Sequence, residues 1–183
     1  ADAGPNHMDT WTPERSRVVR DMCETNGITI GLHTLSAVNV AEYSPYVSRA
    51  VEEYMRASVD LSSQLDCAWT TVHAGYHFTG DVPERKKASL DRLKRICKYG
   101  LDTGQRILLE NLNFEPEHAE VHYMAHTVEE TREYFNEIPA EHMGWAFTAN
   151  HSHLVPDGID GFLDAFGIDR IGEVRLADNH GEY

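Results

Sequence analysis

Short apolar segments alternate along the chain with longer charged segments. The apolar segments are rich in β-branched and aromatic residues and lie at residues 28–32, 68–72, 107–109, 143–147 and 171–174. Near-continuous apolar runs of this length are typical of strands that are buried on both faces, as in a parallel sheet. The pattern therefore predicts five buried strands.

The longer segments are amphipathic and predict helices. We expect these helices at residues 13–26, 45–65, 83–101, 127–138 and 159–166. Pro13, Pro45 and Pro83 stand where the first three begin, and proline is favoured at the first helical position. Thr127 and Glu130 form a capping box at the start of the fourth. Alternation of helices and strands predicts βαβ units with a parallel sheet.

The choice between an open sheet and a closed barrel depends on motifs and length. Neither GxGxxG nor GxxxxGK[ST] follows any predicted strand, which disfavours a nucleotide-binding doubly wound sheet. A complete eight-stranded barrel needs about 200–250 residues. Five strands, with a possible strand end at residues 1–3, fall short of eight. We expect an α/β fold, a (β/α)8 barrel that is incomplete in this chain, forming a single domain over residues 1–183.

Composition narrows the possible partners and compartment. The net charge of −14, from 30 acidic and 16 basic residues, opposes binding to a phosphate backbone, so no nucleic-acid partner is expected. No apolar run approaches the roughly 18–20 residues that span a bilayer, so no membrane partner is expected either. The 3 cysteines are widely spaced and include no CxxC pair. This usage favours a reducing cytoplasm over a disulfide-bonded framework.

Polar residues follow the predicted strands at intervals of roughly forty positions. They are His33, His73, Glu110 and His151. In a β/α barrel the carboxyl ends of successive strands converge on one rim, which is where these folds place their active sites. Two imidazoles and a carboxylate suit Zn²⁺, Mn²⁺, Fe²⁺ or Co²⁺. The spacing therefore predicts a metal site formed by His33, His73 and Glu110.

Structural roles are the alternatives for these polar residues. A carboxylate that ends a buried strand is costly unless it is paired, ligated or protonated, and an ion pair with Arg175 would satisfy Glu110 without a metal. A second histidine group, His118, His122 and His126, has the spacing of one helix face and could hold a metal there. We favour a solvent-exposed segment or lid for that group, because it lies in an acidic stretch.

Several stretches resemble the xylose isomerase-like barrels, a superfamily that includes sugar-phosphate isomerases and epimerases, ketose 3-epimerases, dehydratases and endonuclease IV. The matching stretches are residues 31–33, 71–75, 108–111, 150–154, 162–167 and 170–178. The resemblance implies that the chain begins at the end of the second barrel strand and stops after the seventh. Barrel strands 1 and 8 would then be absent.

The resemblance also implies roles for the residues in these stretches. The catalytic candidates are Glu110 and His73. The substrate-binding candidates are His33, Asn111, His151 and Arg175. The metal-binding candidates are His33, His73, Glu110 and His151. Two positions depart from the family pattern, because Thr148 replaces an aspartate of its metal site and Arg175 replaces a histidine. Arg175 could instead bind a carboxylate or phosphate of the substrate.

The function implied by the resemblance is an isomerase or epimerase that depends on a divalent metal (Mn, Zn, Mg or Co). Its partner would be a small carbohydrate, namely a sugar, sugar phosphate or polyol. The alternatives are a metal-dependent lyase that dehydrates a cyclic polyol, a hydrolase of the endonuclease IV type, and a degenerate barrel that binds without catalysis. The sequence does not decide whether the chain forms a homo-oligomer.

Overall fold

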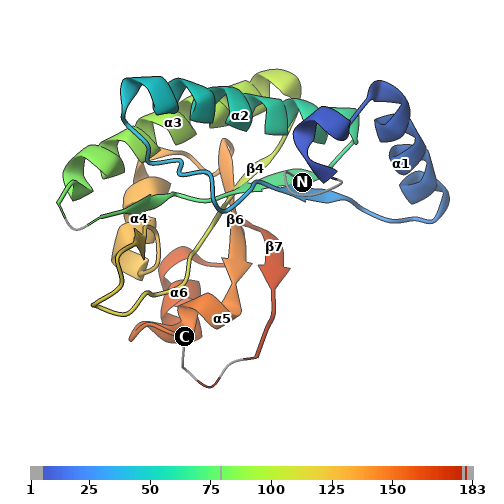
Figure 1. Ribbon diagram of the computed structural model, residues 1–183. Helices are drawn as coiled ribbons and strands as arrows, with labels where there is room; N and C mark the ends of the chain where they lie inside the picture. The colour runs from blue at the N-terminus through green and yellow to red at the C-terminus, as the bar shows by residue number, and fades with distance from the viewer. Residues whose placement is uncertain (1–5, 79, 179, 181–183) are drawn as a thin grey trace.

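A five-stranded parallel sheet forms the centre of the computed structural model, which describes residues 6–78, 80–178 and 180 (Figure 1). The strand order is β1-β2-β4-β6-β7, so each of these five strands pairs with the next of the five along the chain. These strands are β1 Gly31–His33, β2 Trp69–Val72, β4 Ile107–Glu110, β6 Met143–Thr148 and β7 Ile171–Arg175. The sheet curls into part of a barrel, which confirms the predicted incomplete α/β barrel. The possible strand end at residues 1–3 lies outside the described residues.

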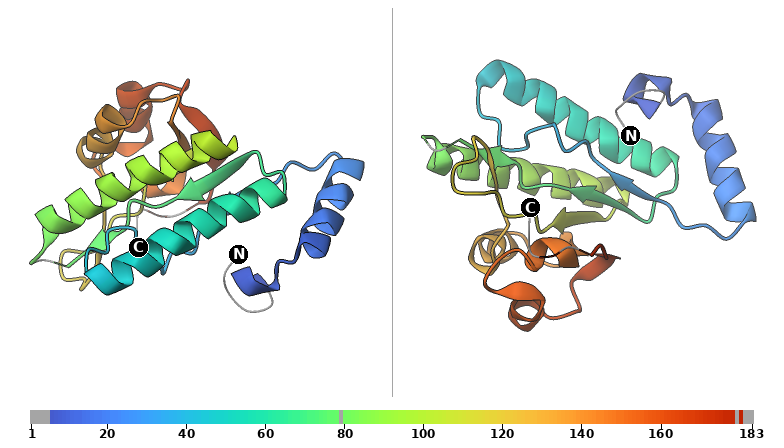
Figure 2. Two further views of the ribbon diagram at one scale, coloured as in Figure 1. Left: turned by 90° about the horizontal axis from the view of Figure 1, so that it is seen from above. Right: turned by 60° about the horizontal axis from the view of Figure 1, so that its bottom comes forward.

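Four helices pack against the outer side of the sheet and supply side chains to the core (Figure 2). They are α2 Pro45–Gln64, α3 Val82–Thr103, α4 Val128–Glu137 and α6 Gly158–Phe166. Two further helices, α1 Pro13–Thr25 and α5 Ala149–Ser152, contact α2 and α6 respectively. The capping signals act as predicted: the Thr12 hydroxyl accepts from the Arg15 amide, and the Thr127 hydroxyl from the Glu130 amide. Among the described residues, none of the helices has the length and apolar character needed to cross a bilayer.

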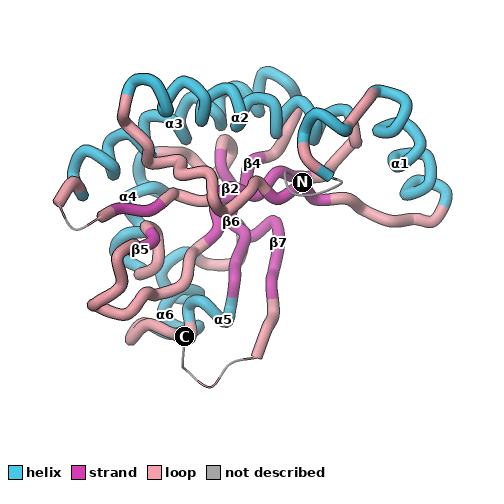
Figure 3. Tube along the Cα trace, in the orientation of Figure 1, coloured by secondary structure: helices cyan, strands magenta, loops and turns pink. Residues whose placement is uncertain are grey.

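Four short elements were not predicted from the sequence. They are the 3₁₀ helix η2 Met8–Thr10, the helix α5, and the strands β3 Tyr76–His77 and β5 His122–Tyr123. The last two pair antiparallel, apart from the main sheet (Figure 3). Each element spans at most four residues, which is too short for a hydrophobic period to show. The predicted first strand also begins later than expected, at Gly31 rather than residue 28.

The core lies between the sheet and its helices. Trp145 on β6 is fully buried there and contacts the rings of Phe135, Phe147, Phe162 and Phe166. Offset and edge-to-face ring pairs of this kind add to the stabilisation that burial gives. This aromatic cluster joins β6 to α4 and α6, and so fixes the sheet beneath the polar inner face.

A β-bulge decides which residues of β7 face the inside of the barrel. Trp145 pairs with Ile171, but the next residue, Ala146, pairs with Glu173 rather than Gly172. The extra residue turns Glu173 and Arg175 to the inner face, level with Ala146 and Thr148 of β6. A regular strand would have placed Gly172 and Val174 there instead.

The aromatic cluster predicts a stability effect. Trp145→Ala leaves a cavity that the neighbouring rings cannot fill, so we expect the free energy of unfolding to fall by about 3–5 kcal/mol. Urea denaturation followed by circular dichroism measures the change. The control is Val174→Ala on β7, because Val174 is 55% exposed and its truncation should change stability by only about 0.5 kcal/mol. Equal effects of the two substitutions would contradict the packing described here.

Candidate functional site

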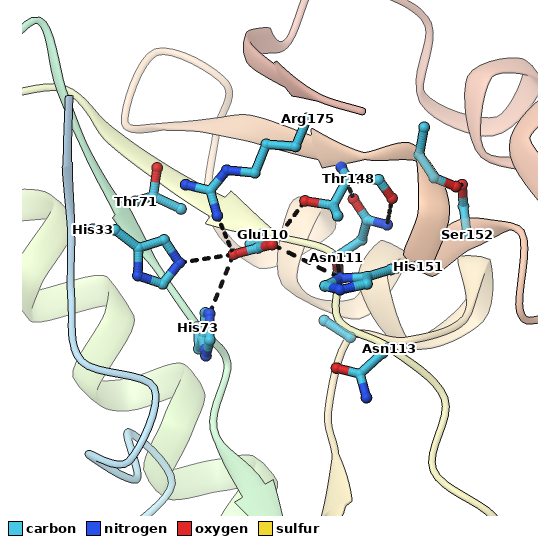
Figure 4. Close-up of polar contacts among 12 residues, drawn as sticks. His33, Thr71, His73, Glu110, Asn111, Asn113, Thr148, His151, Ser152 and Arg175 are labelled. Carbon is cyan, nitrogen blue, oxygen red and sulfur yellow. Dashed lines mark hydrogen bonds and ion pairs between the residues drawn. The ribbon is translucent and has the colours of Figure 1, made fainter. Parts of the chain in front are cut away.

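Glu110 lies at the centre of the polar residues on the inner face of the sheet (Figure 4). It ends β4 and is only 3% exposed. Its Oε2 lies 3.0 Å from Nε2 of His33, 3.2 Å from Nε2 of His73 and 2.9 Å from Nη1 of Arg175. Its Oε1 accepts a hydrogen bond of 2.7 Å from the Thr148 hydroxyl. One carboxylate therefore gathers side chains from the ends of four other strands.

The three residues predicted to meet at the rim do lie together. One ligand atom from each of His33, His73 and Glu110 lies within 4.8 Å of the others. The ion pair between Glu110 and Arg175, which the sequence offered as the structural alternative, is present in the same place. The structure therefore contains both arrangements at once, and the carboxylate oxygen Oε2 is common to them.

Glu110 carries its negative charge at neutral pH. Burial of the carboxylate favours the neutral form, but hydrogen bonds to His33, His73 and Thr148 outweigh burial and hold the pKa of Glu110 well below its usual range. A buried anion of this kind is stable only because polar and positive groups surround it. Removal of any one of these groups lowers the free energy of unfolding, because the buried charge is then less well compensated.

The hydrogen bonds of His33 restrict where its protons lie. Nδ1 of His33 contacts the carbonyl oxygen of Thr34, which can only accept, so Nδ1 carries a proton. In a neutral ring Nε2 would then present a lone pair to the anionic Oε2 of Glu110. That contact is stable only with a positive charge between the two atoms, either a second ring proton or a metal ion. The geometry therefore places either a proton or a metal ion between Nε2 of His33 and Oε2 of Glu110.

His73 is the more deeply buried of the two histidines. Its exposed fraction is 8%, and burial lowers its pKa despite the nearby Glu110 carboxylate, which favours the charged form. The ring is therefore neutral at neutral pH. Nδ1 of His73 has no hydrogen-bond partner among the described residues. His73 thus brings one neutral nitrogen to Glu110 without adding charge.

Glu173 is a site residue that the sequence analysis missed. Nε and Nη2 of Arg175 donate to its two carboxylate oxygens, each at 3.0 Å. The Thr71 hydroxyl and the Trp69 indole N–H donate to the same carboxylate at 2.8 and 3.1 Å. Burial opposes ionisation, yet the contacts with Arg175 and Thr71 lower the pKa of Glu173. The i, i+2 spacing of Glu173 and Arg175 could have signalled a shared strand face.

His151 and Asn111 lie beside the carboxylate but play different parts. Nδ1 of His151 donates to the Asn111 carbonyl at 2.9 Å and is 3.8 Å from Oε1 of Glu110. The Asn111 side chain is fully buried and bonds the Thr148 backbone and the Trp145 indole. Asn111 thus ties the end of β4 to β6 beside the site. Its role in substrate binding stays a prediction.

The second histidine group does not form a helix. His122 lies in β5 and stacks on His77, with ring centroids 5.6 Å apart. Nδ1 of His126 is 3.0 Å from the Glu130 carboxylate, and His118 is exposed. The helical alternative is therefore wrong, because the chain here runs as a loop with one short strand.

The donor set at the rim suits a divalent metal. A tetrahedral ion with bonds near 2.1 Å holds its ligand atoms about 3.4 Å apart. The distances of 3.0 and 3.2 Å from Oε2 of Glu110 to the two imidazole nitrogens are close to that spacing. The Nδ1 proton of His33 is held by a carbonyl, as is common for metal-bound histidine. His33, His73 and Glu110 could therefore hold the ion.

The sequence profile of the xylose isomerase-like TIM barrel family matches residues 1–182. This chain belongs to that family. No curated protein matches the chain. Membership agrees with the curled parallel sheet and with the resemblance that the strand-end motifs indicated.

Solved structures of this barrel family share the fold at low sequence identity. A D-tagatose 3-epimerase-like protein is 21% identical, with a TM-score of 0.82 over 98% of this chain and 66% of its own. D-psicose 3-epimerase from Clostridium cellulolyticum H10 is 15% identical, with a TM-score of 0.75 over 91% and 58%. The 3-keto-D-glucoside 4-epimerase from E. coli is 16% identical, with a TM-score of 0.75 over 92% and 66%. This chain therefore spans about three fifths to two thirds of their length.

The ionised Glu110 predicts a pH-dependent loss of stability in a variant. Because folding lowers its pKa, Glu110 contributes stability that is complete above its usual pKa of 4.5 and is lost as the pH falls further. Glu110→Gln should therefore lower the free energy of unfolding by about 3 kcal/mol at pH 7. The difference from the natural chain should shrink steadily below pH 4.5. Chemical denaturation at a series of pH values measures it.

The matched control is Glu53→Gln, which neutralises an exposed carboxylate on α2. We expect it to change stability by less than about 0.5 kcal/mol. A Glu110→Gln effect that is equally large at pH 7 and pH 3 would show that packing, rather than charge, explains the loss.

Proposed function

We propose that this chain forms the larger part of a carbohydrate isomerase or epimerase that uses a divalent metal at the rim of the barrel. One observation carries the proposal: a buried, ionised glutamate at a strand end meets two imidazole nitrogens at distances that suit a metal. Two of the structural neighbours named above are epimerases of sugars or sugar derivatives. We therefore propose a small sugar, sugar phosphate or polyol as the substrate.

The metal site consists of His33, His73 and Glu110. A bound Mn²⁺, Zn²⁺, Mg²⁺ or Co²⁺ would polarise a carbonyl or hydroxyl oxygen of the sugar and so make the neighbouring C–H more acidic. The negative charge of Glu110 would attract the ion, and the neutral ring of His73 would offer it a nitrogen without opposing its charge. The Nδ1 proton of His33 is held by the Thr34 carbonyl, so Nε2 is the nitrogen that would bind the ion.

Proton transfer requires a base with a lone pair available to accept the proton. Glu110 is a weak base here, because its contacts stabilise the anion. His151 is better arranged for this role. Its Nδ1 proton is fixed on the Asn111 carbonyl, so in the neutral ring Nε2 carries the lone pair. We propose that Glu110 anchors the site and that His151 takes the proton from the carbon next to the polarised oxygen.

Solvent deuterium exchange tests the proposed function. The purified chain is incubated in D₂O with Mn²⁺ and a panel of ketohexoses, ketose phosphates and keto-inositols, and proton NMR follows the loss of the signal next to the carbonyl. Glu110→Gln should slow the exchange at least about 100-fold, because the metal loses its anionic ligand. His151→Gln should slow it by a similar factor, as expected for loss of the base.

The exposed-carboxylate variant Glu53→Gln serves again as the control and should exchange at the natural rate. Exchange by Glu110→Gln at the natural rate would contradict the proposal. A new alkene or enone signal in place of exchange would assign the site to a dehydrating lyase instead.

A further inference from the structure

Arg175 places a fixed positive charge on the oxygen atom that the metal would bind. Its Nη1 lies 2.9 Å from Oε2 of Glu110, the same oxygen that both histidines approach. We propose that Arg175 is a built-in competitor of the divalent metal, so that the natural chain binds metal far more weakly than its His33, His73 and Glu110 ligands alone would allow. This inference rests on the proposed function, because it concerns the affinity of the same site.

Arg175 cannot simply swing away to admit the ion. Its Nε and Nη2 form a two-point contact with the Glu173 carboxylate, and the guanidinium is planar and rigid. Movement of Nη1 away from Glu110 would break the geometry of those two bonds as well. Glu173 is itself held by Thr71 and the indole of Trp69. Glu173 and the side chains that hold it therefore fix the position of the Arg175 guanidinium.

Charge makes the competition strong. A metal ion bonded to Oε2 of Glu110 would lie within a few ångströms of the guanidinium, in a region where Glu110 is 3% exposed and screening by water is weak. The guanidinium has only donors and no lone pair, so it cannot ligate the ion and can only repel it. The ion must displace Nη1 or tolerate it, and either course lowers the affinity.

The bulge in β7 is the local cause of this arrangement. It turns Arg175 and Glu173 to the inner face together, so that the arginine arrives with its own anchor. An arginine without Glu173 could extend into solvent when a metal binds. The paired placement therefore indicates that the guanidinium is a permanent part of the site.

Cobalt titration of the purified chain tests the inference. Co²⁺ bound by imidazole and carboxylate groups absorbs visible light, so the binding curve reports this coordination rather than activity. We expect Arg175→Met to bind Co²⁺ at least tenfold more tightly than the natural chain. Arg175→Gln should show a similar gain. Arg175→Lys keeps the charge but loses the planar fork that Glu173 holds, so its gain should be smaller than that of Arg175→Met. Circular dichroism confirms that each variant is folded.

Two controls separate the competitor from the site itself. Arg49→Met removes an equal charge from the exposed surface of α2 and should leave the affinity unchanged. His73→Ala in the Arg175→Met background should abolish the visible band, because it removes a ligand. Equal affinities of the natural chain, Arg175→Met and Arg175→Gln would overturn the competition while leaving the metal site standing. Absence of the band in every variant would overturn both proposals.

Discussion

The buried carboxylate of Glu110 is the constraint on which the polar face of this half-barrel depends. An ionised group at the end of a central strand loses its hydration, so hydrogen bonds and positive charge must replace the water. Thr148 satisfies one oxygen, while His33, His73 and Arg175 converge on the other. These partners come from the ends of four strands, and each is held there by the register of the sheet. Electrostatics and strand geometry are therefore inseparable in this site.

The same oxygen serves two kinds of positive charge. The imidazoles of His33 and His73 give Glu110 the donor set of a metal site, and the Nδ1 proton of His33 leaves room for either a proton or a metal ion between its Nε2 and Oε2 of Glu110. Arg175 brings to the same oxygen a positive charge that the chain itself provides. Because Glu173 clamps the arginine, the balance between guanidinium and metal is set by the fold rather than by a mobile side chain.

Much of this arrangement follows from the sequence. Apolar runs and helix caps predict the alternation of strands and helices, and the spacing of His33, His73 and Glu110 predicts their convergence. The inward turn of Glu173 does not follow, because a one-residue bulge reverses the side-chain alternation of β7 and leaves no mark in the hydrophobic pattern. The short strand β5 that contains His122 could not be predicted either, because it spans two residues and pairs with β3, which lies far from it in the sequence.

Anomalous diffraction from crystals soaked in Mn²⁺ shows whether Glu110, His33 and His73 bind a metal. Data collected at the manganese edge locate the ion independently of any assumption about its ligands. We predict a peak within bonding distance of Oε2 of Glu110 and Nε2 of both His33 and His73, with lower occupancy in the natural chain than in Arg175→Met. A manganese peak elsewhere on the barrel, with Glu110 bonded only to Arg175 and the histidines in both proteins, would contradict it.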